Sequence, residues 1–360
     1  MIYLSPPHMG GRELEYVKEV FESNYIAPVG EFINKFEEAV KNYVNAKGAV
    51  ALCNATSAIH LALRILGIRD SKVAVPTFTF IGSVNPILYE NNEPVFIDVD
   101  EYWHMDLNLL EDALKKEKIK AIVAVHIYGQ MADIENIKFL ADKYGVFLIE
   151  DAAEALGAYK KGKKKYAGTF GKMGVYSFNG NKLLTTSSGG VMVSDNIEYI
   201  KRAKFLSTQA KEPEFVEYVH KEVGFNYRMS NVLAAIGVGQ MEVIDERIRK
   251  KREIFETYKK ELKEIASFMP ELPGTFGTRW LTTLTFNELD PFKVMDALRK
   301  NEIESRPLWN PMHLQPLFKN AKTYLNGKSE ELFKKGLCLP SGTTLTEKEI
   351  KGICEIIRSV

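Results

Sequence analysis

The chain has few cysteines, almost no net charge and no long apolar run, and each shortage excludes a class of protein. Its three cysteines, Cys53, Cys338 and Cys354, are odd in number and widely spaced, which predicts neither a disulfide framework nor a metal site. The 48 basic and 47 acidic residues argue against a nucleic-acid-binding protein. No apolar run approaches the roughly 18 residues that a membrane span needs, and no signal peptide is recognisable. We therefore expect a cytoplasmic protein without a membrane partner.

Short apolar strands alternate with helices over most of the first half of the chain. The expected strands are Val50–Cys53, Val73–Val75, Val95–Ile97, Ala121–Val125, Val146–Ile149, Val175–Phe178 and Val191–Val193. This alternation predicts an α/β fold with a mainly parallel sheet that is covered on both faces. Such sheets bind their ligands at the carboxyl ends of the strands.

Helical spacing and length together predict two domains. A helix near the amino terminus carries Leu14, Val17 and Phe21 on one face. A long helical region from Ser230 to about Ala266 is expected to link a large domain, residues 1–245, to a small C-terminal domain, residues 246–360. Other expected helices are Glu31–Val44, Ala58–Leu66, Leu107–Lys116, Ile134–Tyr144, Pro291–Lys300 and a last helix opened by a capping box at Thr346–Glu349.

Lys182 stands on a polar turn between two apolar strands, within Gly174–Gly190. Two interpretations are open. Most lysines are exposed, and this one would then mark a solvated hairpin tip. Alternatively, a dry pocket or a cationic neighbour favours the neutral amine, which makes the lysine a Schiff-base nucleophile.

Three further motifs follow expected strands at the same edge of the sheet. Asp151 ends the Val146–Ile149 strand region and is either a helix N-cap or the partner of a protonated pyridine nitrogen. Thr56 and Ser57 lie at a helix start, where they either cap the helix or present N–H groups to an anion. Phe80 either packs in the core or lies flat on a planar cofactor. Together with Lys182, these motifs predict a single site.

Motifs spread over nearly the whole chain resemble those of the DegT/DnrJ/EryC1/StrS family of sugar-nucleotide aminotransferases. The matching stretches are SNYIAPVGEFINKFE, NATSAIHLAL, PTFTFIGSVNP, PVFIDVD, IEDAAEALGA, YSFNGNK with GG seven residues on, GFNYRMSN and SRPLWNPMHLQPLF. The combination is specific, although no single stretch is. The resemblance implies an aspartate-aminotransferase-like large domain of fold type I, a smaller α+β C-terminal domain, and pyridoxal 5′-phosphate (PLP), with pyridoxamine 5′-phosphate as its aminated form.

The resemblance also implies roles for individual residues. Lys182 forms the Schiff base with PLP and moves the proton to C4 of the sugar, and Asp151 pairs with the pyridine nitrogen. The other implied cofactor contacts are Glu154 near O3′, Phe80 on the ring face, Thr56, Ser57 and Ser177 at the phosphate, and Asn226 from the other subunit. The last match implies a homodimer with two shared sites.

Two departures from the family's common pattern suggest a substrate. Ser177-Phe178-Asn179 replaces Ser-Phe-His, and Ser188-Gly189-Gly190 replaces Glu-Gly-Gly. With the opening LSPPHMGG and Glu154, they resemble the branch that makes UDP-N-acetylbacillosamine precursors. The implied substrate is UDP-2-acetamido-2,6-dideoxy-α-D-xylo-hexos-4-ulose, with L-glutamate as amino donor. The expected sugar-nucleotide contacts are Tyr25, Ile26, Asn181, Arg306, Trp309, His313 and, from the partner subunit, Arg228.

Other interpretations stay open at this point. The substrate could be another UDP-, dTDP- or GDP-linked keto sugar. Relatives that act as sugar dehydratases replace the lysine with histidine, so Lys182 argues against that activity. A catalytically inactive regulatory or binding protein on the same fold is disfavoured by the presence of both Asp151 and Lys182. Trp309 and His313 could also serve interdomain packing instead of substrate binding.

Overall fold

The computed structural model describes all residues, 1–360, and places one eight-stranded sheet at the centre of the molecule. The strands, in spatial order, are β1 (Gly48–Leu52), β9 (Gly190–Ser194), β8 (Met173–Ser177), β5 (Phe147–Asp151), β4 (Ile119–Val125), β2 (Lys72–Pro76), β3 (Glu93–Ile97) and β14 (Lys322–Tyr324). Strand β9 is antiparallel to both of its neighbours, whereas the other pairs are parallel. The seven strands expected from the sequence and their mainly parallel arrangement are confirmed.

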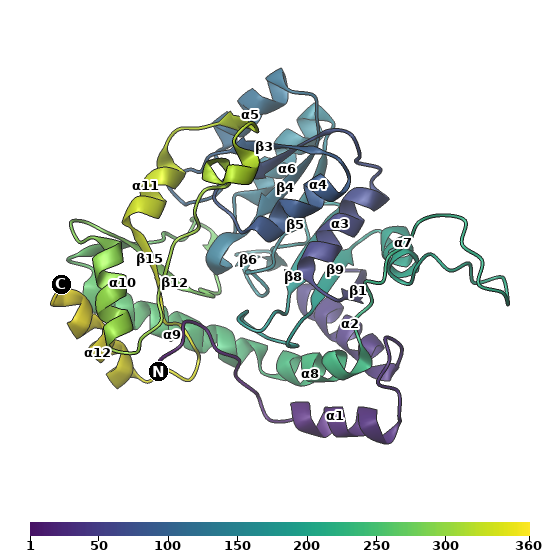
Figure 1. The fold of residues 1–360 in the computed structure, drawn as a ribbon, viewed down its shortest axis with the longest axis horizontal. Helices are drawn as coiled ribbons and strands as arrows, with labels where there is room; N and C mark the ends of the chain where they lie inside the picture. Colours follow the sequence, from purple (N-terminus) through teal and green to yellow (C-terminus); the bar gives the residue numbers. More distant parts are fainter.

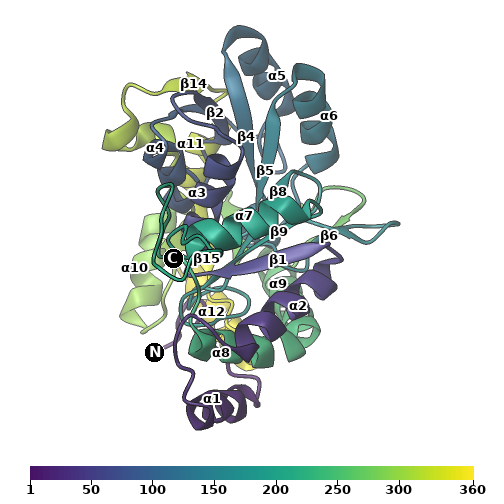
Figure 2. The same cartoon turned by 90° about the vertical axis from the view of Figure 1, so that its right-hand side faces the viewer.

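Helices cover both faces of this sheet (Figures 1 and 2). One face carries α3 (Ala55–Ile65), α4 (Asn85–Tyr89) and α7 (Ile197–Ser207), and the other carries α2 (Glu31–Val44), α5 (Leu107–Lys116) and α6 (Ile134–Tyr144). Helix α2 buries Phe32, Phe36 and Val40 against the sheet, as its apolar stripe predicts. The sheet is therefore closed off from water on both faces, and its free strand ends are left for a site.

A second, antiparallel sheet forms the C-terminal part of the molecule. Its strands, in spatial order, are β10 (Ala266–Phe268), β12 (Thr282–Phe286), β15 (Gly336–Leu339) and β13 (Arg306–Pro307). The helices α9 (Ile244–Leu262), α10 (Pro291–Lys300) and α12 (Glu347–Arg358) pack around it. Thr346 and Glu349 form the expected capping box of α12. We propose that the boundary between the two domains lies near residues 245–246, at the start of α9.

The remaining elements lie outside these two sheets. They are α1 (Glu13–Glu22), α8 (Asn231–Glu242), α11 (Lys328–Lys335) and the small sheet β11 (Thr275–Phe276), β6 (Tyr159–Lys160) and β7 (Lys165–Tyr166). The helical region expected from Ser230 to Ala266 is divided at Val243, which separates α8 from α9 and has non-helical dihedral angles. Strand β14 comes from the C-terminal part but extends the large sheet beside β3, which the sequence analysis did not foresee.

Helix α1 forms where expected, but the predicted apolar face is wrong. Leu14 and Phe21 are 65% and 61% exposed, whereas Tyr16 and Val20 are buried. Polar contacts fix which face of α1 is buried. The Glu13 carboxylate accepts hydrogen bonds from the backbone N–H groups of the preceding loop and from a side chain of α8. The stripe of Leu14 and Phe21 is therefore left on the outer surface.

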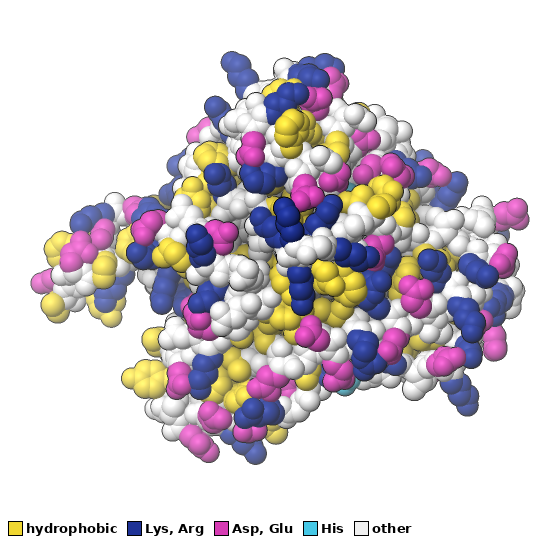
Figure 3. Space-filling view, turned by 180° about the vertical axis from the view of Figure 1, so that it is seen from behind, with side chains coloured by type: hydrophobic (Ala, Val, Ile, Leu, Met, Phe, Trp, Pro, Cys, Tyr) yellow, Lys and Arg dark blue, Asp and Glu magenta, His cyan; other side chains and the backbone are white.

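The surface carries charges of both signs. Figure 3 shows Lys and Arg side chains interspersed with Asp and Glu over the face opposite to that of Figure 1. A hairpin arm, residues 208–226, projects from the molecule beyond α7 (Figure 1) and is joined by the bridges Lys211↔His220 and Thr208↔Asn226. None of the helices combines the length and the apolar composition that crossing a bilayer requires.

A buried lysine ties the N-terminal segment to the C-terminal sheet. Lys251 of α9 is 2% exposed, and its Nζ donates to the carbonyl oxygen of Ser341 at 2.7 Å and to the hydroxyl of Ser5 at 3.2 Å. No carboxylate pairs with it. Burial therefore lowers the pKa of Lys251 to about 7, because the charged form loses its hydration.

We expect Lys251 to make stability depend on pH in a defined direction. Between pH 7 and about 10, the unfolded chain binds a proton at this lysine and the folded chain does not. The free energy of unfolding should therefore rise with pH across that window, by about 3–5 kcal/mol in total. Urea unfolding at several pH values would show this gain in the wild type relative to Lys251→Met. The control variant Lys259→Met changes a lysine on the exposed side of the same helix, and its free energy of unfolding should depend on pH as that of the wild type does. The same pH dependence in Lys251→Met would contradict the assignment.

Candidate active site

A cavity of about 270 Å³ lies where the parallel strands of the large sheet end. Its walls include residues that lie at or just after the carboxyl ends of β1, β2, β4, β5 and β8. Six of the residues expected to contact a cofactor line it: Thr56, Phe80, Asp151, Glu154, Ser177 and Lys182. The structure thus brings residues that are more than 120 positions apart in the sequence to one place.

Lys182 is enclosed and does not form an exposed hairpin tip. Its side chain is 12% exposed, and Nζ donates to Oε1 of Glu154 at 3.2 Å. The same Nζ lies 3.9 Å from the ring centroid of Trp280. A backbone hydrogen bond of 3.0 Å from Lys182 to the carbonyl of Asn179 fixes the turn that carries it. Of the two interpretations left open by the sequence, the structure supports the lysine held in a pocket.

Asp151 is the last residue of β5 and is buried. Its Oδ2 accepts a hydrogen bond from the hydroxyl of Ser83 at 2.6 Å, and Oδ1 accepts from the backbone N–H of Ala153 at 3.0 Å. No helix begins here, so the helix-cap interpretation is excluded. Because two hydrogen bonds hold this carboxylate and it faces the cavity without a basic partner, it can accept a further hydrogen bond from a cationic ring N–H.

Glu154 lies beside Lys182 on the turn that follows β5. Its Oε2 accepts from the backbone N–H of Tyr128 at 2.7 Å, and Tyr128 presents that group from a left-handed backbone conformation (φ 53°). Burial raises the pKa of Glu154, and the charge of Lys182 opposes the rise. The carboxyl group is therefore poised to exchange a proton or a hydrogen bond with groups in the cavity.

The start of α3 corrects one expectation. Asn54 is the N-cap, and its side chain accepts from the backbone N–H of Ser57 at 2.8 Å, so that N–H group is not free for an anion. The hydroxyl of Ser57 contacts Sγ of Cys53 at 3.3 Å, and Ser57 does not line the cavity. The first helical N–H groups, those of Ala55 and Thr56, remain at the cavity, where the helix dipole favours an anion.

The aromatic residues near the cavity differ in their exposure and in their contacts. Phe78 is buried in the core, whereas Phe80 is 50% exposed at the cavity wall, so the core interpretation of Phe80 is wrong. Trp309 lies parallel to the ring of Tyr128, at a centroid distance of 6.0 Å, and its backbone N–H donates to the Tyr128 hydroxyl at 2.9 Å. The indole N–H of Trp309 is buried and has no hydrogen-bond partner in the protein.

A larger cavity, of about 830 Å³, adjoins the first. Asn181, Trp280 and Trp309 line both cavities. Arg306 lines the outer cavity, with its guanidinium 2.9 Å from Glu304 and largely exposed. Three of the expected sugar-nucleotide contacts, Asn181, Arg306 and Trp309, therefore meet around a space into which a substrate can extend from the inner cavity.

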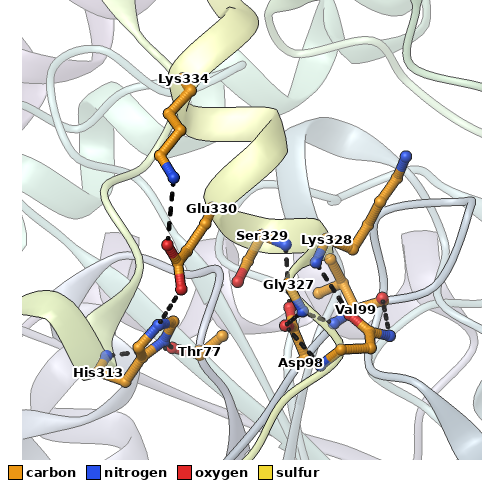
Figure 4. Close-up of polar contacts among 10 residues, drawn as sticks. Thr77, Asp98, Val99, His313, Gly327, Lys328, Ser329, Glu330 and Lys334 are labelled. Atoms are coloured by element: carbon orange, nitrogen blue, oxygen red, sulfur yellow. Dashed lines mark hydrogen bonds and ion pairs between the residues drawn. The ribbon is translucent and has the colours of Figure 1, made fainter.

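His313 lines neither cavity, and Figure 4 shows its side chain between Thr77 and Glu330. Its Nδ1 lies 2.7 Å from the Thr77 hydroxyl and its Nε2 lies 3.4 Å from Oε1 of Glu330. Glu330 also contacts Lys334 at 3.4 Å, and the bond with His313 is the main cause of its lowered pKa. His313 thus joins the C-terminal segment to the end of β2, which fits the packing interpretation.

The other expected contacts lie away from both cavities of their own subunit. The Arg228 guanidinium is buried and donates to Glu37 Oε1 and to the carbonyl of Ala51, each at 2.7 Å. Both bonds use Nη1 of the guanidinium. Tyr25 and Ile26 are exposed on the loop between α1 and α2, and Asn226 is exposed at the base of the hairpin arm. A role in a site shared with a second subunit stays a prediction for Arg228, Tyr25, Ile26 and Asn226.

Sequence reasoning missed two residues that fix the site. Ser83 orients Asp151, and Trp280 packs on Lys182. Ser83 lies within the matching stretch PTFTFIGSVNP, but nothing in that stretch singles it out as a partner of Asp151. Trp280 lies outside all the matching stretches and reaches the site through a tertiary contact.

The inner cavity fits the PLP that the sequence implies. It offers an oriented carboxylate for a ring nitrogen, an enclosed lysine for an aldehyde, and the N-terminus of α3 for a phosphate. The half-exposed ring of Phe80 supplies an apolar surface for a planar ring. These groups meet in one cavity, so no part of the cofactor lacks a chemically matched residue.

The chain is similar to aminotransferases of known sequence and structure. Residues 7–358 match the model of the DegT/DnrJ/EryC1/StrS aminotransferase family. EpsN of Bacillus subtilis (strain 168), named as a pyridoxal phosphate-dependent aminotransferase, is 48% identical over 99% of this chain and 95% of its own. GDP-perosamine synthase of Escherichia coli O157:H7 is 38% identical over 98% and 96%. The crystal structure of the aminotransferase TlmJ from Streptoalloteichus hindustanus superposes with a TM-score of 0.93 at 26% identity, covering 100% of this chain and 98% of TlmJ.

Proposed function

This chain belongs to the DegT/DnrJ/EryC1/StrS aminotransferase family, and we propose that it transfers an amino group from L-glutamate to the C4 keto group of a UDP-linked sugar. Its cofactor is PLP. The observation that carries the proposal is the enclosed Lys182, which contacts Glu154 and lies in one cavity with Asp151. A single lysine among the residues of that cavity matches a reaction that needs one covalent attachment point and one proton carrier.

We assign separate roles to residues of the inner cavity. When bound, PLP supplies a pyridine ring that stabilises negative charge at the carbon losing its proton. Asp151 accepts a hydrogen bond from the ring nitrogen and keeps that nitrogen protonated. Lys182 Nζ removes the proton from the amino donor and returns one to sugar C4. Thr56 and Ser177 bind the phosphate, Glu154 contacts the ring oxygen, and Phe80 covers the ring face. Trp280 and Trp309 restrict the access of water to the lysine.

The substrate we propose is UDP-2-acetamido-2,6-dideoxy-α-D-xylo-hexos-4-ulose, and the products are UDP-2-acetamido-4-amino-2,4,6-trideoxy-α-D-glucose and 2-oxoglutarate. The Ser177-Phe178-Asn179 and Ser188-Gly189-Gly190 variants, with the opening LSPPHMGG, support it. Arg306 at the outer cavity offers a guanidinium for a diphosphate, and Trp309 lines the same cavity. Remote binding of UDP can then hold C4 over Lys182.

A GDP-linked 4-keto-6-deoxyhexose is the second candidate, because the GDP-perosamine synthase relative covers nearly the whole chain. Purified enzyme should be assayed with L-glutamate and UDP-, dTDP- and GDP-linked keto sugars, and the C4 configuration of the product should be read by NMR. We expect kcat/KM for the UDP acetamido sugar to exceed the others by at least about 100-fold, the scale of two lost polar contacts. A preference for the GDP sugar would replace our substrate with the second candidate.

We further propose that the enzyme is a homodimer whose hairpin arm, residues 208–226, reaches the partner's site. The arm projects from the molecule (Figure 1) and exposes Phe215, Val216 and Tyr218. Exposed apolar side chains on a protruding arm favour contact with another protein surface. Asn226 at its base would contact the partner's cofactor phosphate, and Tyr25 and Ile26 would face the partner's substrate. Sedimentation at micromolar concentration measures the assembly, and a monomeric enzyme with full activity would contradict it.

A further inference from the structure

Trp280 lies against the lysine of the inner cavity, although it belongs to the C-terminal part of the chain. It is 1% exposed and stands between β11 and β12. Its ring centroid lies 3.9 Å from Lys182 Nζ. Its indole N–H donates to the carbonyl oxygen of Asn181 at 2.7 Å. One side chain thus contacts both the amine of Lys182 and the peptide group immediately before it.

Trp280 is itself held in place from the large sheet. The backbone N–H of Thr278 donates to the carbonyl of Gly129 at 2.7 Å. Gly129 has φ +85°, and a Cβ at that position would lie 2.5 Å from the backbone nitrogen of Trp280. The close approach of the two segments therefore requires glycine there. On the adjoining side, buried Arg279 donates to the carbonyl of Met269 at 2.8 Å. The backbone that leads into Trp280 is therefore fixed by two contacts, at Thr278 and at Arg279.

This fixed indole limits the freedom of Lys182. A lysine side chain has up to about 2 kcal/mol of rotamer entropy to lose, and catalytic groups need placement to within roughly 0.5 Å. A cation over an aromatic face is held by about 1–2 kcal/mol when water is excluded. Glu154 provides a contact on Lys182 as well. Without Trp280, the carboxylate alone would define where the amine points.

We propose that Trp280 is the positioning residue of Lys182: its N–H group anchors the turn at Asn181, and its ring face holds the amine in the cavity. The inference rests on the proposed function only in taking Lys182 as the lysine that binds PLP. Trp280 also lines the outer cavity. It acts through Lys182 and takes no part in proton transfer.

The test compares Trp280→Leu and Trp280→Phe with the wild type, and Trp103→Phe serves as control. Trp103 is another buried tryptophan that lines neither cavity. Phenylalanine keeps a ring over Nζ but loses the N–H donor, whereas leucine loses both. Two readouts use the apoprotein: hydrogen–deuterium exchange of residues 179–185, and the rate of PLP capture followed by absorbance and borohydride trapping.

We expect faster exchange of residues 179–185 by about 5-fold or more in both Trp280 variants, since both lose the bond to Asn181. PLP capture should slow by about 10-fold in Trp280→Leu and by less in Trp280→Phe. With glutamate and keto sugar, kcat should fall more than KM rises. Trp103→Phe should match the wild type in exchange and capture.

The proposal would be overturned if Trp280→Phe showed the wild-type rate of hydrogen exchange at residues 179–185 and the wild-type rate of PLP capture. If Trp280→Leu does not fold, Trp280→Phe alone provides the test. PLP capture needs no sugar nucleotide, so a wrong substrate assignment leaves the test intact. If the wild type itself captures no PLP at Lys182, the proposed function fails instead, while the exchange data still decide whether Trp280 anchors the turn.

Discussion

Transamination by Lys182→Ala is expected to fall by at least about 10⁴-fold, because the reaction loses its nucleophile and its proton carrier together. Lys182 is the one lysine that lines the inner cavity, and its enclosed Nζ contacts Glu154 and Trp280. No second amine is placed to substitute for it. Both half-reactions, with glutamate and with the keto sugar, should be lost, and borohydride reduction should no longer link PLP to the protein.

The control for this variant is Lys163→Ala, which removes a lysine from the exposed turn between β6 and β7. It should keep wild-type activity and PLP capture. Unfolding of Lys182→Ala should be measured in parallel, since removal of the lysine leaves the buried Glu154 without its partner and favours the protonated carboxyl group. Residual turnover above one thousandth of the wild-type value, in a folded protein, would mean that another group carries the proton.

The site was predictable from sequence wherever a residue lies directly after a strand. Asp151 ends β5 and Ser177 ends β8, and parallel strands deliver such residues to one edge of a sheet. Their mutual closeness then follows from topology alone. Lys182 lies five residues beyond β8, so its strand position alone did not predict that it belongs to the site. That prediction depended on the other motifs and on the resemblance to a family.

Contacts between distant segments were not predictable in the same way. The rotation of α1 follows from polar contacts of Glu13 rather than from its apolar stripe. Arg228 donates to Glu37 and Ala51, and no local pattern signals a buried ion pair between residues that far apart. Trp280 reaches the site because the C-terminal part packs against the large domain, whereas Ser83 reaches it through a contact between the segment after β2 and the end of β5. Sequence periodicity describes which face an element can bury, but it does not say which neighbour will cover it.

Replacing Asp151 by asparagine should reduce kcat by about 10³-fold while leaving the fold intact. The amide is almost the same size, and its oxygen can still accept from the N–H of Ala153, as the carboxylate does at 3.0 Å. It lacks the negative charge that favours a protonated pyridine nitrogen. Without that proton the ring withdraws electrons weakly, so the proton abstraction by Lys182 becomes slower.

The size of this loss separates an electrostatic role of Asp151 from a structural one. Ser83→Ala removes the 2.6 Å hydrogen bond to Asp151 but keeps the charge, so its kcat should fall by only about 10-fold. Asp142→Asn, at an exposed position of α6, should have no effect. Stopped-flow measurement of the glutamate half-reaction gives the three rates, and the cofactor spectrum reports the protonation of its ring. If Asp151→Asn and Ser83→Ala lose activity equally, the orientation of this side chain matters and its charge does not.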